Sequence, residues 1–403
     1  MVLELLAALP PFILATIAVA LFFDFVNGFH DTANAIATVV GTKVLSPLQA
    51  VSLAAVFNLL GPLVIGTAVA KTISSGILPE GVVKEAGTAL IFSCLAGAIA
   101  WDLITWYWGL PTSSSHALVG GLIGAGVAAA GMAGALWPSL EEGRLVLEFA
   151  ALGLLAGLGL WGLCYLLRKD FVEAKHAKAF ALAGVAILMP AAVLAGWLHL
   201  SGIGKVVVFM VVSPIMGLAA GFGFAAMVRR AAMNQRPGPA NHFFRRAQLL
   251  SSAFFALNHG ANDAQKTAGV ITALLFAAGF LADAKTIPLW VIVAAASAMG
   301  LGTLFGGWRI IKTMATRITQ LRPYQGFSAE TGGGVVLTLM AQQGIPVSTT
   351  HAITTSIMGV GATHRLSAVR WGVGRRIVWA WVITIPASAL MAAVVYLAAR
   401  AVA

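Results

Sequence analysis

Charged residues are scarce in this chain of 403 residues: 10% are Asp, Glu, Lys or Arg, whereas 59% are hydrophobic. About a quarter of the residues of a soluble globular protein are charged, so this chain has too few polar side chains to cover a globule of its size. There are only two cysteines, Cys94 and Cys164, and each lies inside an apolar stretch. This composition excludes an ordinary soluble protein, a disordered chain and a disulfide-rich secreted domain.

The charge that is present is mostly basic, with 25 Lys and Arg against 14 Asp and Glu. The basic residues lie in short segments and form no basic face interleaved with aromatic residues, which argues against nucleic-acid binding. Between them lie apolar stretches of about 20 residues, long enough to cross a bilayer as helices. The sequence therefore predicts an all-α polytopic membrane protein. The predicted stretches are 8–30, 48–70, 87–108, 111–137, 146–167, 179–200, 205–227, 247–282, 287–307, 331–361 and 377–399.

Two of these stretches differ from simple spans. The stretch 111–137 begins with proline and three hydroxyl residues in a row, and the stretch 331–361 is interrupted by Gly344 and Pro346. Proline removes a helix donor, so both are predicted to be broken or re-entrant helical hairpins. With the hairpins returning to their own side, one face receives 18 Lys and Arg and the other 6. The positive-inside rule makes the first face cytoplasmic and puts both termini outside.

Two motifs occur once in each half of the chain and in the same order. The segment 27–34, Asn-Gly-Phe-His-Asp-Thr-Ala-Asn, matches 259–266, His-Gly-Ala-Asn-Asp-Ala-Gln-Lys, at an offset of 232 residues. The segment 110–116, Leu-Pro-Thr-Ser-Ser-Ser-His, matches 345–351, Ile-Pro-Val-Ser-Thr-Thr-His, at an offset of 235. The predicted sidedness brings the two copies in from opposite faces, so we expect an inverted-topology repeat.

The predicted organisation has three parts. Residues 1–168 form the first transmembrane repeat, and residues 247–403 form the second, inverted repeat. Residues 169–246 supply two linking helices and a basic cytoplasmic loop. The Arg-Pro-Gly-Pro segment at 236–239 marks the linker.

The proline–hydroxyl segments are predicted to begin helices, because proline suits the first helical position and Ser or Thr caps free backbone N–H groups. Helix N-termini bind anions. Two such ends converging from opposite sides would hold a tetrahedral oxyanion such as phosphate or sulfate. The alternative, that these hydroxyls only pack helices in lipid, fits a single copy better than two matched ones.

The aspartates of the other motif are expected to be functional, because a carboxylate deep in a membrane is costly unless it is paired or bound to a cation. Asp31 with Asn34, and Asp263 with Asn262, offer oxygen ligands for a cation. Gly28 and Gly260 precede each aspartate by three residues and are expected to let the chain unwind. A structural ion pair is the alternative, most of all for Asp263.

Lys266 breaks the symmetry, because it stands where the first copy has Asn34. Its ammonium group could replace a bound cation beside Asp263, or it could titrate in a proton path. We favour the first role slightly. Glu330 is expected to pair with an arginine, and Asp24 and Asp102 are expected to form hydrogen bonds between helices.

At these motifs the chain resembles the inorganic phosphate transporter (Pit) family, over nearly its whole length. His30 and the Gln265-Lys266 pair are more similar to the bacterial low-affinity branch. That resemblance implies a multi-pass protein of the bacterial inner membrane that couples phosphate to protons or accepts metal–phosphate complexes, with sodium as the less favoured coupling cation. No cofactor is expected, and a homodimer is left open.

The resemblance and the motifs together give the candidate residues. For phosphate they are Thr112, Ser113, Ser114, Ser115, Ser348, Thr349 and Thr350. For the coupling cation or proton they are Asp31, Asn34, Asn262, Asp263, Gln265 and Lys266, with Asp31 and Asp263 able to hold a metal ion. For a proton relay they are His30, His116, His259 and His351.

These observations predict a secondary active transporter that imports phosphate with a cation by alternating access. A sulfate permease of the same family is the main alternative. An anion channel is less favoured, because a pore lined by Arg or Lys is not evident. An enzyme is not expected, since Ser115 and His116 are adjacent on a helix and point away from each other.

Overall fold

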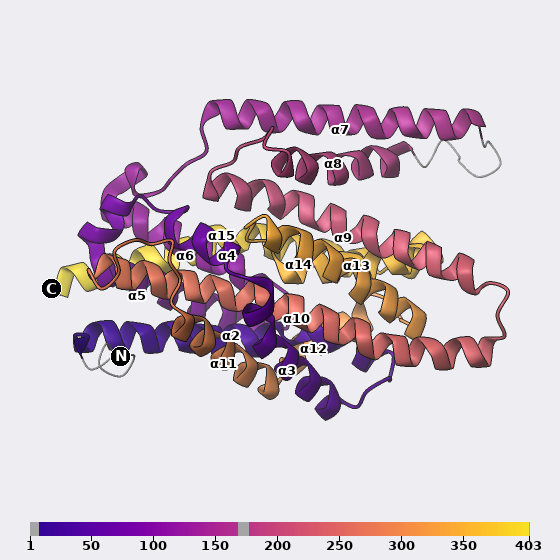
Figure 1. Ribbon diagram of the computed structural model, residues 1–403, viewed down its shortest axis with the longest axis horizontal. Coiled ribbons are helices and arrows are strands. Elements are labelled where there is room, and N and C mark those ends of the chain that lie inside the picture. The colour runs from indigo at the N-terminus through magenta and orange to yellow at the C-terminus, as the bar shows by residue number, and fades with distance from the viewer. Residues whose placement is uncertain (1–7, 168–176, 403) are drawn as a thin grey trace.

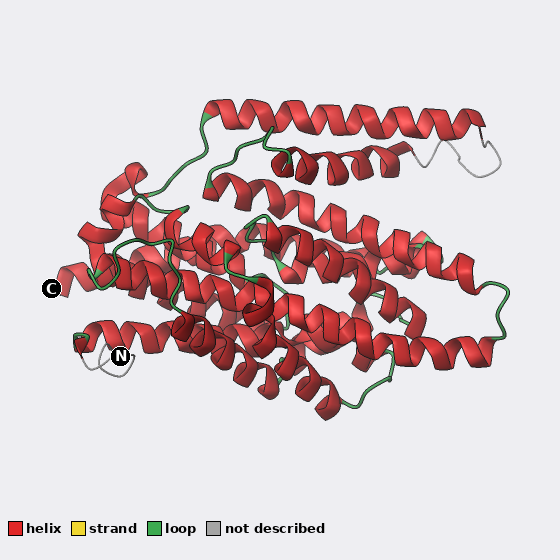
Figure 2. Cartoon of the chain, viewed as in Figure 1, coloured by secondary structure: helices red, strands yellow, loops and turns green. Residues whose placement is uncertain are grey.

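The computed structural model describes residues 8–167 and 177–402, and every regular element within these ranges is a helix (Figure 2). Eight of the described helices are long and apolar enough to cross a membrane, and up to nine if a bent pair counts as one span. The predicted all-α polytopic membrane fold is confirmed. The helices are α2 (Pro11–Gly41), α3 (Pro47–Ile65), α4 (Ala68–Ser75), α5 (Glu80–Trp108), α6 (Ser114–Ala130), η1 (Gly131–Gly134), α7 (Leu140–Leu167), α8 (Ala177–Leu194), α9 (Gly202–Ala232), α10 (Pro237–Ala277), α11 (Leu289–Phe305), α12 (Trp308–Lys312), η3 (Thr313–Arg317), α13 (Pro323–Gln342), α14 (Thr349–Ala362), η4 (Leu366–Ala368) and α15 (Trp371–Val402).

Helices α2 and α10 form the centre of the molecule. Helix α10 packs against α2, α3, α4, α13 and α11, and its residues from Phe255 onward are mostly buried. Helices α2 and α10 run in opposite directions (Figure 1), which is the relation that an inverted repeat predicts. The repeat of the whole halves stays a prediction.

The other helices surround this pair. Helix α15 packs against α5 and α6, and α9 packs against α13 and α14. Helices α7 and α8 pack against each other and form the outermost layer, above α9 in Figure 1. Helix α7 is largely exposed in the single chain, as expected for a helix that faces lipid.

The two ends of the described chain lie at the same end of the molecule (Figure 1). Helix α2 begins and helix α15 ends at one end of the molecule, whereas the α9–α10 connection lies at the opposite end (Figure 1). The basic segment 229–246 is mostly helical, because α9 continues to Ala232 and α10 begins at Pro237. The predicted boundary at residue 246 therefore falls inside α10, and the three-part division itself stays a prediction.

The predicted helix breaks lie in two hairpins, α5–α6 and α13–α14. Helix α5 ends at Gly109 and α13 ends just before Gly344, and both glycines have a φ of 64°. In each turn the next N–H bonds back to the helix, from Leu110 to the carbonyl of Thr105 at 2.9 Å and from Ile345 to that of Met340 at 3.0 Å. This is a Schellman-type helix end that favours glycine. A proline and a capping serine then start the next helix.

The stretch 331–361 is thus broken as predicted, between α13 and α14. The other stretch differs from the prediction: α6 is one continuous helix from Ser114, and the break lies before it, at 109–113. Other breaks in the described helices were not predicted. One separates α3 from α4 at Gly66, one kinks α5 at Gly87, and one bends the chain by 61° between α11 and α12.

Candidate functional site

The two hairpin turns hold capped helix starts with the same geometry. Ser113 Oγ accepts a hydrogen bond from the backbone N–H of His116 at 3.2 Å, and Ser348 Oγ accepts one from the N–H of His351 at 3.1 Å. The N–H groups of the first two residues of α6 and α14 have no partner inside their own helices, as at any helix start. Each turn therefore presents backbone donors at the positive end of a helix dipole.

These two helix starts lie next to each other in the middle of the molecule. The Nζ atom of Lys266 donates a hydrogen bond to Ser115 Oγ on α6 and another, of 2.9 Å, to the carbonyl oxygen of Val347, just before α14. The rings of His116 and His351, one from each helix, have centroids 4.8 Å apart. One nitrogen atom thus reaches both hairpin turns, so the two helix starts lie close together.

The Asp motif of α2 contacts the start of α14. Asn34 Nδ2 donates to Thr350 Oγ1 at 2.9 Å and to Thr349 Oγ1 at 3.3 Å. Thr350 Oγ1 in turn donates to Asp31 Oδ2 at 3.4 Å. These side chains are all buried, so Asp31 and Asn34 meet the hydroxyl groups away from bulk water.

The Asp motif of α10 contacts both hairpin turns. Thr349 Oγ1 donates to Asp263 Oδ2 at 2.9 Å, and Lys266 Nζ lies 2.6 Å from Asp263 Oδ1. The ion pair that was the alternative for Asp263 is therefore present. Asp31, Asp263 and Lys266 bring two carboxyl groups and one amine together, and all three side chains are buried.

Two of the four histidines contact the aspartates. His30 Nδ1 lies 2.6 Å from Asp31 Oδ1, and His259 Nε2 lies 3.2 Å from Asp263 Oδ2. The ligand atoms of Asp31, His259 and Asp263 lie within 4.8 Å of one another, which is close enough to hold a metal ion. The sequence alone did not place His259 in this group.

The other two histidines pack against rings. His351 lies between His116 and Trp381, whose ring centroid is 3.7 Å from its own in a stacked arrangement. Trp381 Nε1 also donates to the carbonyl oxygen of Pro111 at 2.8 Å. This ring stack joins α15 to both hairpins.

Three of the predicted residues bond to neighbouring helices. Gln265 Oε1 accepts from the N–H groups of Val69 at 3.0 Å and Ala70 at 3.4 Å, at the start of α4. Asn262 Nδ2 donates to backbone carbonyl oxygens of α10 and α13. Thr112 Oγ1 donates to Thr105 Oγ1 at 2.8 Å. The bonds of Gln265 and Asn262 join α10 to α4 and α13, whereas Thr112 Oγ1 also lies 3.4 Å from Nε2 of His30.

The expectation for Glu330 was wrong. Its carboxylate accepts hydrogen bonds from Thr38 at 2.5 Å, from Gln248 at 3.1 Å and from Ser251, and these three neutral donors take the place of an arginine. Thr38 and Gln248 come from α2 and α10, so Glu330 joins α13 to the central pair. Asn27 of the same helix donates to Asp24 at 3.5 Å, and the side chain of Thr267 on α10 is a second neighbour of the Asp24 carboxyl group.

The role expected for Gly28 and Gly260 was also wrong. Helices α2 and α10 continue through these positions without unwinding. A Cβ atom on Gly28 would collide with the backbone of Met299 in α11, and one on Gly260 would collide with the backbone of Asn58 in α3. The glycines let neighbouring helices approach closely beside the aspartates.

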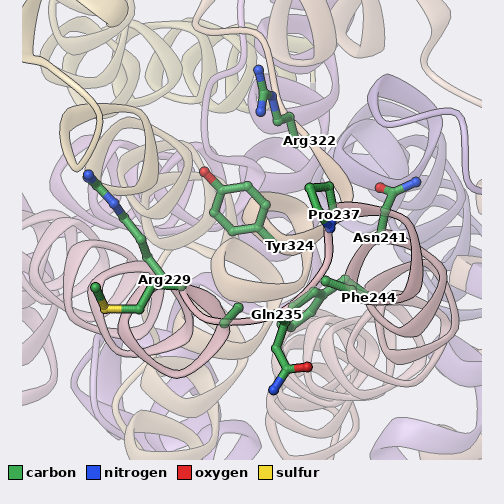
Figure 3. A pocket seen from close by; sticks show the side chains of 10 residues that line it. Arg229, Gln235, Pro237, Asn241, Phe244, Arg322 and Tyr324 are labelled. Carbon is green, nitrogen blue, oxygen red and sulfur yellow. The ribbon is translucent and has the colours of Figure 1, made fainter.

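A surface cavity of about 500 Å³ lies apart from this group of residues, between α9, α10 and α13. Arg229, Phe244, Arg322 and Tyr324 are among the residues that line it (Figure 3). None of the predicted phosphate or cation residues is among its described lining residues. The predicted site is instead a closed cluster in the interior.

Comparison with known proteins adds independent findings. The sequence profile of the phosphate transporter family matches residues 27–176 and 141–392. A probable low-affinity inorganic phosphate transporter of Rhizobium meliloti (strain 1021) is 42% identical over 98% of each chain, and one of Bacillus subtilis (strain 168) is 40% identical over 94% of each. A solved structure described as the sodium-dependent phosphate transporter is 25% identical, with a TM-score of 0.70 over 98% of this chain and all of that one.

Proposed function

Because this chain belongs to the phosphate transporter family, we propose that it imports inorganic phosphate by cation-coupled symport with alternating access. The observation that carries the proposal is the meeting of two capped helix starts beside Asp31 and Asp263. The relatives at 42% and 40% identity are named as probable low-affinity phosphate transporters, which supports phosphate as the substrate.

In this proposal the starts of α6 and α14 bind phosphate from two sides. The backbone N–H groups of Ser114, Ser115, Thr349 and Thr350 donate to its oxygens, as helix N-termini do to anions. The hydroxyl groups add neutral donors that follow a tetrahedral shape. No covalent bond forms or breaks, so the work of the site is binding and release.

Asp31 and Asp263 explain why phosphate transport would be coupled to a cation. Two carboxylates beside the helix starts repel an anion until a cation joins them, because the interior screens charge poorly. Moving an anion inward against an inside-negative potential also requires added positive charge. Phosphate therefore binds well only when a cation is also bound.

We propose a proton or a metal ion as the coupling cation, in preference to sodium. Imidazole nitrogens lie 2.6 Å and 3.2 Å from the two carboxylates, in a position to accept or give a proton. Asp31, His259 and Asp263 also form a group with the N and O ligands that transition metals accept. The solved structure at 25% identity is described as sodium-dependent, so sodium is the cation to test against.

The burial of the site supports alternating access. The hydroxyl residues and both aspartates are no more than 5% exposed, so phosphate cannot reach them without movement of the helices around them. An inverted repeat can open such a site to one side and then to the other. A static channel would need an open path.

Uptake into proteoliposomes tests the function. Labelled phosphate should accumulate above its outside concentration when a proton gradient is imposed, and excess sulfate should compete poorly. Equilibration without accumulation would favour a channel, and preferred uptake of sulfate would favour the permease alternative. Accumulation driven by sodium alone would overturn the choice of cation.

A further inference from the structure

Lys266 and Asn34 occupy matching places in the two halves, both in sequence and in contacts. They are 232 residues apart, the offset that relates the two Asp motifs. Asn34 donates to Thr350, and Lys266 donates to Ser115, and these two hydroxyl residues match each other at the offset of 235. Each residue of the central helices thus contacts the helix start of the opposite half.

The surroundings of the Lys266 nitrogen resemble those of a bound cation. Three oxygen atoms lie around it: the hydroxyl of Ser115, a carboxylate oxygen of Asp263 at 2.6 Å and the carbonyl oxygen of Val347 at 2.9 Å. Hydroxyl, carboxylate and carbonyl oxygens are the ligands that hard cations prefer. They come from three separate elements, as the ligands of a cation between two hairpins would.

Three oxygen atoms around one nitrogen match the three N–H donors of an ammonium group. Every N–H of the ammonium therefore has an oxygen partner already. The side chain therefore has no N–H donor left for phosphate. This geometry fits Lys266 as a fixed positive charge and does not fit it as a direct phosphate ligand.

The matching place in the first half is different. Asn34 brings no charge, and its Oδ1 atom has no hydrogen-bond partner among the described residues. This oxygen belongs to a side chain that also contacts the start of α14, one helical turn from Asp31. Here a cation has oxygen ligands to bind and no resident ammonium to exclude it.

We propose that Lys266 is a built-in cation that permanently fills the second of two equivalent cation places, so that this protein moves one fewer positive charge with each phosphate than a variant without the lysine. The proposal rests on the proposed function, because it counts the charges that accompany phosphate. In this proposal Lys266 sets the number of cations transported with each phosphate and takes no part in proton transfer.

The test replaces Lys266 by the residue of the first half, Lys266→Asn, in the full-length protein. Uptake in sodium-free buffer should fall by about 30-fold, equivalent to about 2 kcal/mol, because Asp263 loses its partner. Sodium or lithium should restore it by binding in the vacated place. The reversal potential should then show one more positive charge per phosphate than in the wild type. Lys285→Asn removes an exposed lysine and is the matched control, with no change expected.

A binding measurement complements transport. Sodium should raise the unfolding temperature of purified Lys266→Asn more than that of the wild type, since a ligand that binds only the native state stabilises it. If Lys266→Asn folds only when sodium is present during purification, that result also supports the proposal. A variant that stays unfolded with sodium and lithium contradicts it.

The outcomes separate the two proposals. Failure of the wild type to accumulate phosphate would overturn the proposed function, and this inference with it. Accumulation by the wild type, together with an unchanged charge per phosphate and no sodium response in Lys266→Asn, would overturn this inference alone.

Discussion

Asp31 lies where residues of α2, α10 and the start of α14 come together. It contacts His30 on its own helix and Thr350 at the start of α14, and its carboxylate lies close to the carboxylate of Asp263 and the imidazole ring of His259. In the proposed mechanism, a side chain with these neighbours interacts with both the anion and the cation. Its effect on coupling is therefore expected to exceed its effect on folding.

Asp31→Asn is expected to abolish accumulation of phosphate while the protein still folds. The amide keeps the size of the side chain but removes the charge that draws in a cation, and we expect a loss of about 100-fold in coupled uptake. Proteoliposome uptake under a proton gradient measures it. Asp283→Asn is the control: Asp283 is exposed, and N–H groups of Lys285 and Thr286 hold its pKa below its usual value. Coupled uptake at the wild-type rate by Asp31→Asn would remove Asp31 from the mechanism.

Ser114→Ala and Thr350→Val each remove one hydroxyl from one helix start. A hydrogen bond to a charged group contributes about 1.5–3 kcal/mol, so we expect either change to weaken phosphate binding by about 10-fold or more. A binding titration on purified protein measures the affinity. Thr331→Val serves as the control, because Thr331 bonds only to Phe327 of its own helix turn. If one variant bound phosphate normally, that helix start would not take part in binding.

At the scale of the helices, close contacts hold the Asp motifs in place. Gly28 lets α11 approach α2, and Gly260 lets α3 approach α10. Asn58 of α3 also contacts His259 Nδ1 at 3.1 Å, so the position of α3 bears directly on the His259–Asp263 pair.

Gly260→Ala is expected to destabilise the protein by about 1–3 kcal/mol, because the new methyl group forces α3 and α10 apart. The unfolding temperature and phosphate uptake should both fall. Gly223→Ala makes the same change in α9, where a Cβ would have open space around it, and should leave stability equal or slightly higher. Equal unfolding temperatures for the two variants would contradict the close-packing explanation.

The sequence predicted the elements that carry a local chemical signal and missed those that depend on distant partners. Pro111 and Pro346, each followed by hydroxyl residues, indicated both helix starts, because the cap lies within a few residues of the break. The breaks at Gly66 and between α11 and α12 lie in apolar stretches without such a signal. Gly28 was misinterpreted because a glycine can serve either unwinding or close approach, and only the neighbouring helix decides between them. The donors to Glu330 lie 79 to 292 residues away, so no local pattern could reveal them.

At the scale of the whole molecule, the site is closed toward both ends. Rocking of one half against the other is the expected way to open it, and an inverted repeat makes the two openings opposite in sense. Positions on the two ends should therefore move in opposite directions during transport.

Spin labels at two pairs of exposed positions test this movement. Leu48 and Leu366 lie beside basic segments of the two halves, and Glu80 and Lys285 lie in connections predicted for the other face. When phosphate and the coupling cation are added, the distance within one pair should grow while that within the other shrinks, by several ångströms. Distances that change in the same sense, or not at all, would argue against rocking halves.

The burial of the polar cluster also matters to the cell when no phosphate is at hand. A core in which carboxylates, hydroxyls and the ammonium bond to one another is expected to leave no continuous water path across the membrane. Ions should then not leak through the protein at rest. Many copies of it can therefore be present in the membrane without lowering the membrane potential.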